Sequence, residues 1–212
     1  MLYLGQNNIT IMTFTIENQI IDKVKKAKRG SLFFGDSFLS KENSEGVRKA
    51  LQRLVKKGEL IRVATGIYAR PEIDPVIGPV TPGIDAIAAA IAKRDKARIA
   101  PTGAYALNRL GLSTQVPLNV VYLTDGATRK VKIGKRTITF KHASPKNVAT
   151  IGEISTLAIQ ALRTIGKDNV TVDEIEKIQQ ILKKEKPTHL QYDYRLAPEW
   201  IRKIMQPTLK QE

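Results

Sequence analysis

The stretch SEGVRKALQRLVKKGELIRVATGIYARP, residues 44–71, decides how the fold of this chain is interpreted. In its first half, apolar residues recur three and four positions apart, which predicts an amphipathic helix that ends at Gly58. The second half predicts two short strands, residues 60–64 and 67–70, joined by a tight turn at Thr65-Gly66. The stretch therefore predicts a helix with one buried face, followed by a hairpin.

The residues upstream complete a small domain, which we place at residues 13–71. Three elements are predicted there: a helix at 15–30, a short strand at 31–34 and a brief helical turn at 35–40. Thr15 can cap the first helix, and Gly30 ends it. Three helical segments followed by a two-stranded wing, at these short spacings, favour DNA binding.

The face of the predicted helix opposite its apolar stripe is polar and cationic. Arg and Gln side chains read base edges, Ser and Lys side chains hold phosphates, and a glycine turn lets the backbone approach a phosphate closely. The predicted DNA-binding residues are Ser44, Arg48, Lys49, Gln52, Arg53, Lys56, Arg62, Thr65 and Arg70. The alternative interpretation is a solvated amphipathic helix beside an ordinary hairpin.

The formal net charge of +15 is concentrated in the first two thirds of the 212 residues. Residues 1–71 contain 13 Lys and Arg against 6 Asp and Glu, residues 72–150 contain 12 against 5, and residues 151–212 contain 10 against 9. A basic surface attracts polyanions through counterion release, so the charge favours a nucleic-acid partner. Solubility alone is the other explanation.

The composition argues against several classes of protein. The chain has no cysteine, and its two histidines, His142 and His189, are far apart without carboxylates at ligand spacing. No glycine-rich phosphate loop, no nucleophile elbow and no Gly-Ser pair followed by closely spaced aspartates occurs. We therefore expect a cytoplasmic protein that is not an enzyme, needs no metal or cofactor and does not enter a membrane. Residues 1–11 carry no interpretable pattern, and Met12 is a candidate start.

A proline-rich segment divides the chain. Residues 72–83 are predicted to be a linker, because prolines at this density continue neither a helix nor a central strand. Residues 84–212 predict a second, mixed α+β domain with a small antiparallel sheet and C-terminal helices, so the fold class is α+β. Its predicted helices start at Thr81-Pro82 and span 102–110, 154–165, 171–184 and 198–205; its predicted strands are 98–101, 119–124, 129–133 and 136–142.

A second basic cluster lies in the last predicted hairpin of this domain. Its members are Arg129, Lys130, Lys132, Lys135 and Arg136. Lysines on an edge strand commonly discourage the addition of a further strand. The cluster is otherwise a second phosphate contact or the binding site for an acidic patch on a partner protein.

Two segments of the chain resemble a known family. SLFFGDSFLSKENSEGVRKALQRLVKKGELIRVATGIYARP, residues 31–71, resembles the N-terminal winged helix-turn-helix of AbiEi-type antitoxins, which belong to type IV toxin–antitoxin systems. APTGAYALNRLGLSTQVPLNVVYLTDG, residues 100–126, resembles the start of the second domain in antitoxin-like relatives. The resemblance extends from residue 15 to about residue 142, and the C-terminal helices match only loosely.

The resemblance implies a repressor of its own operon, with the operator as its double-stranded DNA partner. It also implies that the C-terminal domain neutralises a nucleotidyltransferase-like toxin encoded by the adjacent gene. On the matching positions, Ser44, Arg48, Lys49, Gln52 and Arg53 would face the operator, and Arg62 and Arg70 would lie along the wing. Two alternatives remain: a stand-alone regulator whose second domain senses a ligand or forms dimers, and a protein-binding or RNA-binding module that uses the hairpin 129–136.

Overall fold

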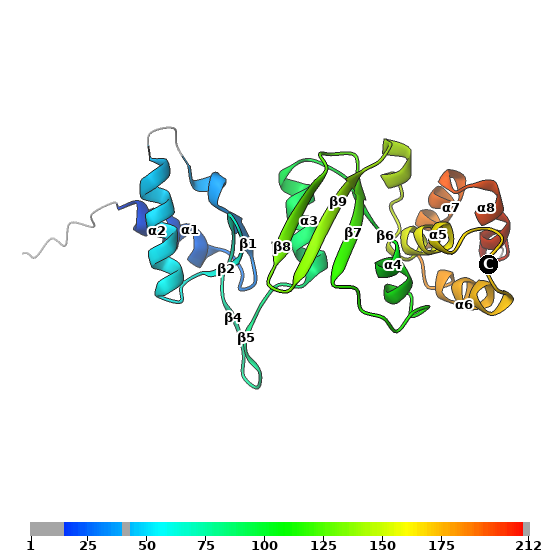
Figure 1. Cartoon of the computed structure of the whole chain (residues 1–212), viewed down its shortest axis with the longest axis horizontal. Coiled ribbons are helices and arrows are strands. Elements are labelled where there is room, and N and C mark those ends of the chain that lie inside the picture. Colours follow the sequence, from blue (N-terminus) through cyan, green and yellow to red (C-terminus); the bar gives the residue numbers. More distant parts are fainter. Residues whose placement is uncertain (1–14, 40–42, 210–212) are drawn as a thin grey trace, which may run out of the picture. The chain divides into compact units, whose positions relative to one another are not determined.

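The computed structural model describes residues 15–39 and 43–209. Within these residues the chain is a mixed α+β protein with small sheets and several helices (Figure 1). It divides into two compact units between Pro82 and Gly83, here called unit 1 and unit 2. The candidate start at Met12 and the last residue of the predicted turn 35–40 lie outside the described residues.

Unit 1 begins with two helices and a three-stranded sheet. Its elements are α1 (Ile16–Lys26), β1 (Leu32–Phe34), the short 3₁₀ helix η1 (Gly35–Phe38), α2 (Ser44–Lys56), β2 (Ile61–Ala64) and β3 (Ile67–Ala69). Thr15 caps α1 as predicted, because its hydroxyl accepts a hydrogen bond from the N–H of Asn18 at 3.2 Å. The helix ends before the predicted Gly30, since the backbone is already extended at Ala27.

The predicted hairpin forms the centre of the sheet. β3 lies between β1 and β2, and both neighbours run antiparallel to it. Gly66, in the turn between β2 and β3, has a φ of +72°, a conformation that costs glycine little. The predicted apolar stripe of α2 packs inward on α1 and the sheet, and the buried core of unit 1 contains Ile20, Val24, Phe33, Val47, Ala50, Leu51, Leu54, Leu60 and Tyr68.

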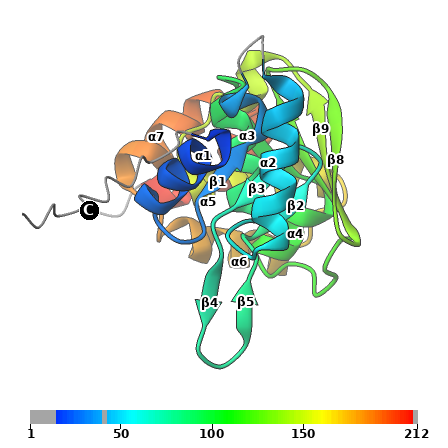
Figure 2. The same cartoon turned by 90° about the vertical axis from the view of Figure 1, so that its left-hand side faces the viewer.

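The predicted linker contains a second hairpin that the sequence did not predict. β4 (Glu72–Asp74) pairs antiparallel with β5 (Gly78–Val80), and the carboxylate of Asp74 accepts hydrogen bonds from Val76 and Ile77 in the turn. Proline is tolerated here because a two-stranded sheet has only edge strands, where a missing N–H need not break the ladder. Figure 2 shows the two strands of this hairpin side by side.

Unit 2 combines a four-stranded sheet with six α-helices among its described residues. Its elements are α3 (Ile84–Arg94), β6 (Ile99–Thr102), α4 (Ala104–Arg109), β7 (Asn119–Thr124), β8 (Arg129–Ile133), β9 (Arg136–His142), η2 (Pro145–Val148), α5 (Glu153–Ile165), α6 (Val172–Leu182), α7 (Pro187–Leu196), α8 (Glu199–Met205) and η3 (Gln206–Leu209). No helix in residues 15–39 or 43–209 has the length and apolar character needed to cross a membrane.

The sheet of unit 2 is mixed, whereas the sequence predicted an antiparallel one. Its strand order is β6-β7-β9-β8, with antiparallel pairing at β6–β7 and β8–β9 and parallel pairing at β7–β9. The tight turn at Gly134-Lys135 forces β8 and β9 to be antiparallel. Because β9 inserts between β7 and β8, the chain crosses over before β8, and hydrophobic periodicity does not report such a strand order.

Two helix caps of unit 2 differ from the prediction, and one α-helix was not predicted. α3 begins after Gly83 instead of Thr81, and α4 begins after Gly103, which has a φ of +64°, instead of Thr102. α7 was not predicted; Pro187 occupies its first position, where the missing N–H costs no hydrogen bond. Thr171 and Glu174 form a capping box at the start of α6, in which each side chain accepts a hydrogen bond from the backbone N–H of the other residue.

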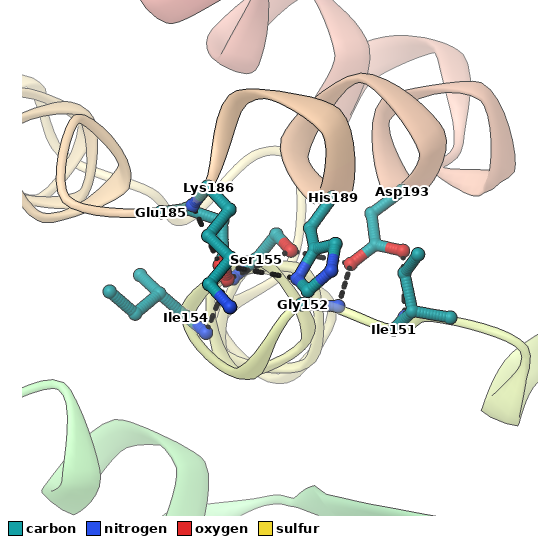
Figure 3. Close-up of polar contacts among 8 residues, drawn as sticks. All are labelled: Ile151, Gly152, Ile154, Ser155, Glu185, Lys186, His189 and Asp193. Atoms are coloured by element: carbon teal, nitrogen blue, oxygen red, sulfur yellow. Dashed lines mark hydrogen bonds and ion pairs between the residues drawn. The ribbon is translucent and has the colours of Figure 1, made fainter.

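The N-terminus of α5 is closed by two carboxylates from the following helical region (Figure 3). Asp193 of α7 is fully buried and accepts hydrogen bonds from the N–H groups of Ile151 and Gly152, at 2.8 and 2.9 Å, and from the hydroxyl of Ser155. Glu185 accepts hydrogen bonds from the N–H groups of Ile154 and Ser155. These bonds satisfy the first amides of the most buried helix of unit 2 and hold α7 against it.

Candidate nucleic-acid interface

A groove in unit 1 lies between α2, η1 and the β2–β3 hairpin. Its volume is about 740 Å³, and its lining includes apolar residues of α2 and β3, namely Val47, Leu51, Val55 and Tyr68. The N–H of Gly35 donates a hydrogen bond to the carbonyl of Gly66 at 2.8 Å, which ties η1 to the turn of the hairpin. The groove walls are therefore fixed by backbone contacts and by the core beneath them.

Six of the nine predicted DNA-binding residues line this groove, and all six are exposed. They are Ser44, Arg48, Gln52, Lys56, Arg62 and Thr65. The four from α2 follow one another at intervals of four residues, so they form one row along the helix. β2 contributes Arg62 and the turn contributes Thr65, which places polar side chains on both walls.

The cations of the groove have no acidic partner. Neither Arg48, Lys56 nor Arg62 forms a side-chain hydrogen bond or an ion pair with any described residue. Asp36 is the single carboxylate among the residues that line the groove. Three positive charges against one negative charge make the groove electropositive.

The other three predicted residues are engaged outside the groove. Lys49 pairs with Glu45 one turn earlier on α2, at 2.9 Å. Arg53 binds Glu17 of α1 at 2.7 Å, and hydrogen bonds from Lys57 and Arg53 hold the pKa of Glu17 below its ordinary value.

Arg70 has a structural position that the sequence did not indicate. Its guanidinium donates hydrogen bonds to the carbonyls of Lys25, at 2.9 Å, and Ala27 at the C-terminal end of α1. A cation there complements the helix dipole and satisfies carbonyls that the helix leaves unpaired. Arg70 therefore fastens α1 to the sheet, and the expectation that it lies along the wing is not met.

The groove also contains residues that the sequence reasoning missed. Leu39 is about half exposed at its edge, and Asp36 and Gly35 come from η1. A Cβ atom at Gly35 would lie 3.5 Å from the ring of Tyr68 and 3.7 Å from the carbonyl of Gly66, so glycine permits the close approach of η1 to the hairpin. No local pattern signals these contacts, because they join segments about thirty residues apart.

The second basic cluster is divided between the two faces of the sheet in unit 2. Arg129 points toward the face that α3 covers, where it pairs with Asp95 and stacks over the ring of Phe140 at 5.2 Å. Arg136 is partly buried on the same face. Lys130 and Lys132 point to the opposite face, and Lys135 lies in the turn. The five residues therefore do not form one site.

Unit 2 has a cavity of about 400 Å³ beside a polar network. The carboxylate of Asp85 on α3 accepts hydrogen bonds from the hydroxyls of Tyr105, at 2.7 Å, and Tyr122, at 2.5 Å, and from Arg109. Burial, and secondly the hydrogen bond to Asp85, raise the pKa of Tyr122. Arg109 also binds Glu153 at 3.2 Å, so the network joins α3, α4, β7 and α5.

Comparison with known proteins identifies a family. Residues 19–190 match a family described as "Family of unknown function (DUF6088)". The chain belongs to this family. A search of the curated proteins found no match.

The DUF6088 chain is also similar to a solved structure, the crystal structure of RV2827C protein from Mycobacterium tuberculosis. The sequences are 11% identical, the match covers 93% of this chain and 82% of that one, and the TM-score is 0.41. At that score the likeness carries no structural argument. The chemistry of this family member therefore has to be inferred from its own residues.

The groove of this DUF6088 protein presents hydrogen-bond donors to solvent. No group of three or more His, Asp or Glu side chains among the described residues is arranged to hold a metal ion. The donors of the groove are guanidinium, ammonium, amide and hydroxyl groups above an apolar floor. Such a set donates hydrogen bonds to phosphate oxygens and to the acceptors of base edges.

Proposed function

We propose that this protein is a DNA-binding transcriptional repressor and that residues 13–71 form a winged helix-turn-helix. The observation that carries the proposal is the groove: six predicted residues gather there, and its three cations have no acidic partner among the described residues. The element order of α1, β1, η1, α2, β2 and β3 supports the same assignment. If α2 were only an amphipathic helix exposed to solvent, there would be no reason for its polar row to face Arg62 and Thr65 of the hairpin across a groove.

In the proposed mechanism, α2 enters the major groove and the β2–β3 hairpin lies on the flanking backbone or in the minor groove. Arg48 and Gln52, in the middle of the row on α2, read base edges. Ser44 and Lys56 at its two ends hold phosphates, and Arg62 and Thr65 hold the backbone beside the wing. Operator occupancy would then block transcription.

We further propose that the protein is the antitoxin of a type IV toxin–antitoxin pair. It would repress its own operon, and unit 2 would neutralise a nucleotidyltransferase-like toxin encoded by the adjacent gene. The support is the resemblance of residues 31–71 and 100–126 to AbiEi-type antitoxins. Co-expression with the adjacent gene tests this: growth rescue is expected, and continued growth arrest with both proteins present would refute it.

One observation favours a second candidate function. The cavity of unit 2 has the size of a small-molecule site, and Arg109 and Tyr122, whose pKa is raised by burial and by Asp85, line it. A stand-alone repressor whose second unit senses a small ligand would use such a cavity. A ligand that raises the melting temperature of residues 83–212 and changes operator affinity would support this reading over the antitoxin.

DNA binding is tested with the promoter of the protein's own operon. Gel shifts compare wild type, Arg48→Ala in the groove and Arg53→Ala on the same helix but outside the groove. Arg48→Ala should weaken operator binding by on the order of 1–3 kcal/mol and random DNA by much less. Equal losses on both DNAs for Arg48→Ala would show that Arg48 grips phosphate instead of reading a base.

A further inference from the structure

The sheet of unit 2 has one face that is uncovered along β8 and β9, where Lys130, Lys132 and Lys141 are exposed. α3 lies on the opposite face, as both cartoon views show (Figures 1 and 2), and its Asp85 contacts Tyr122 there. The strand register puts Lys130 beside Thr139 and Lys132 beside Thr137 on the uncovered face. Lys141 follows two residues after Thr139 on the same side. We call Lys130, Lys132, Lys141, Thr137 and Thr139 the lysine face.

The lysine face carries positive charge that nothing neutralises. None of its three lysines forms an ion pair with a described residue, and all three are exposed. The strand positions that share this face on β6 and β7 are Ala100, Thr102, Asn119, Val121 and Leu123, and none is acidic.

The acids of this part of unit 2 are occupied by arginines. Asp125 binds Arg98 at 2.9 Å, Asp95 binds Arg129, and Asp85 binds Arg109. Residues 72–150 hold 12 Lys and Arg against 5 Asp and Glu, so pairing of the arginines leaves the positive excess mainly on lysines. Three of those lysines are on the lysine face.

The side chains of this face suit phosphate better than protein or bases. Lysine is a point charge on a flexible stem, and threonine hydroxyls contact phosphate oxygens. Lys130 and Lys132 are two residues apart on one strand, or about 7 Å. The face has no aromatic side chain, so it offers neither a stacking platform for unpaired bases nor the aromatic anchors typical of protein interfaces.

We propose that the lysine face binds the phosphate backbone of duplex DNA without regard to sequence. This proposal rests on the proposed function in one respect, because it takes duplex DNA as the partner. The lysine face itself is separate from the groove, since the two belong to different units. Each lysine that neutralises a phosphate releases counterions, so the face adds to the salt dependence of binding and not to its specificity. The two surfaces on one chain would bind one duplex more tightly than either does alone.

The test uses the full chain and a random-sequence duplex. The triple variant Lys130→Gln/Lys132→Gln/Lys141→Gln is compared with Lys167→Gln/Lys183→Gln/Lys184→Gln, which removes three exposed lysines elsewhere in unit 2. The slope of log affinity against log salt should fall by about 2.7 in the first variant, since each phosphate contact contributes about 0.9. The slope of the second variant should stay at the wild-type value, although the net charge of the two proteins is the same.

The outcomes separate this inference from the proposed function. A wild-type slope in the first variant overturns the inference and leaves the groove untouched. If the slope falls as expected but Arg48→Ala and Arg62→Ala leave operator binding unchanged, the inference stands and the proposed function fails.

Two controls address folding and the chemistry of the partner. Replacing the same three lysines with arginine should restore the slope, which a misfolded protein would not do. Polyglutamate with the same number of charges should compete poorly with the duplex. Equal competition by polyglutamate would show that the face takes acidic proteins and would overturn the assignment to phosphate.

Discussion

The groove of unit 1 and the helical part of unit 2 treat their charged side chains in opposite ways. In the groove, Arg48 and Arg62 face solvent, and neither has an acidic partner in the part of the chain that the structure describes. In unit 2, Arg109 binds two carboxylates, and the fully buried carboxylate of Asp193 accepts three hydrogen bonds. The difference shows that formal charge and available charge are separate quantities: residues 1–71 and 72–150 have the same excess, yet only the unpaired groups can bind a polyanion.

This comparison predicts that paired groups act on stability and unpaired groups on binding. The largest effect is expected at Asp193, the most buried of the charged residues. Asp193→Ala should lower the free energy of unfolding of unit 2 by about 3 kcal/mol, because two amides and one hydroxyl lose their acceptor. Chemical denaturation of residues 83–212 measures it, with the exposed Asp173→Ala as a control expected within about 0.5 kcal/mol. Equal destabilisation by Asp193→Ala and Asp173→Ala would contradict the claim that paired, buried charges act on stability.

Binding should respond to the groove and not to its surroundings. Arg48→Ala and Gln52→Ala are each expected to cost on the order of 1–3 kcal/mol of operator affinity with unchanged unfolding free energy, because neither side chain forms a hydrogen bond or ion pair within residues 15–39 and 43–209. Fluorescence anisotropy with operator and random duplexes measures the affinity of each variant for the two DNAs. A loss of stability in place of affinity would show that these side chains are structural.

Acid should weaken unit 2 through Glu185. Burial raises the pKa of this carboxyl, but hydrogen bonds from backbone N–H groups outweigh the burial, and the pKa lies below its ordinary value of 4.5. A depressed pKa means that the carboxylate stabilises the folded state above the unfolded pKa and that this contribution disappears as pH falls through the folded pKa.

The measurement for Glu185 is a difference between two proteins. Wild type should be more stable than Glu185→Gln at pH 7, and the gap should shrink as the pH is lowered below about 4.5. Thermal unfolding of both proteins from pH 7 to pH 3 gives the gap. A gap that stays constant over this range would mean that the charge of Glu185 does not contribute.

The smallest effect is expected for two lysines on the same helix. Lys56 lines the groove, whereas Lys49 pairs with Glu45 outside it. Lys56→Ala should reduce the salt slope of DNA binding by about 0.9 unit, and Lys49→Ala should leave it nearly unchanged. If both variants shift the slope alike, the boundary of the groove has been drawn in the wrong place.

Local patterns predicted the helix face correctly, and long-range pairing escaped them. The spacing of Ser44, Arg48, Gln52 and Lys56 follows from helical periodicity, so the row was visible in the sequence. Arg70 binds carbonyls at the end of α1 more than forty residues away, and Arg53 binds Glu17 on another helix. Charge and periodicity identify such side chains as exposed cations, because nothing local indicates their partners.

Sequence patterns predicted most helices and strands of unit 2, but they did not predict the order of the strands in its sheet. β8 and β9 were expected from alternation and the turn at Gly134-Lys135, but the parallel pairing of β7 with β9 depends on strand order. α7 was missed because proline is found both after the end of a helix and at its first position, and the sequence around Pro187 did not distinguish the two. The lysine face also depends on strand order, since only the register shows which lysines share a side.

The central claim, that the groove holds DNA, is tested most directly by site-directed crosslinking. The chain has no cysteine, so Gln52→Cys and Lys49→Cys each introduce a unique thiol for a photoreactive label. With operator duplex bound, the label at position 52 in the groove should crosslink to DNA strongly, and the label at position 49 outside it only weakly. Equal crosslinking from both positions, or none from position 52, would contradict the account.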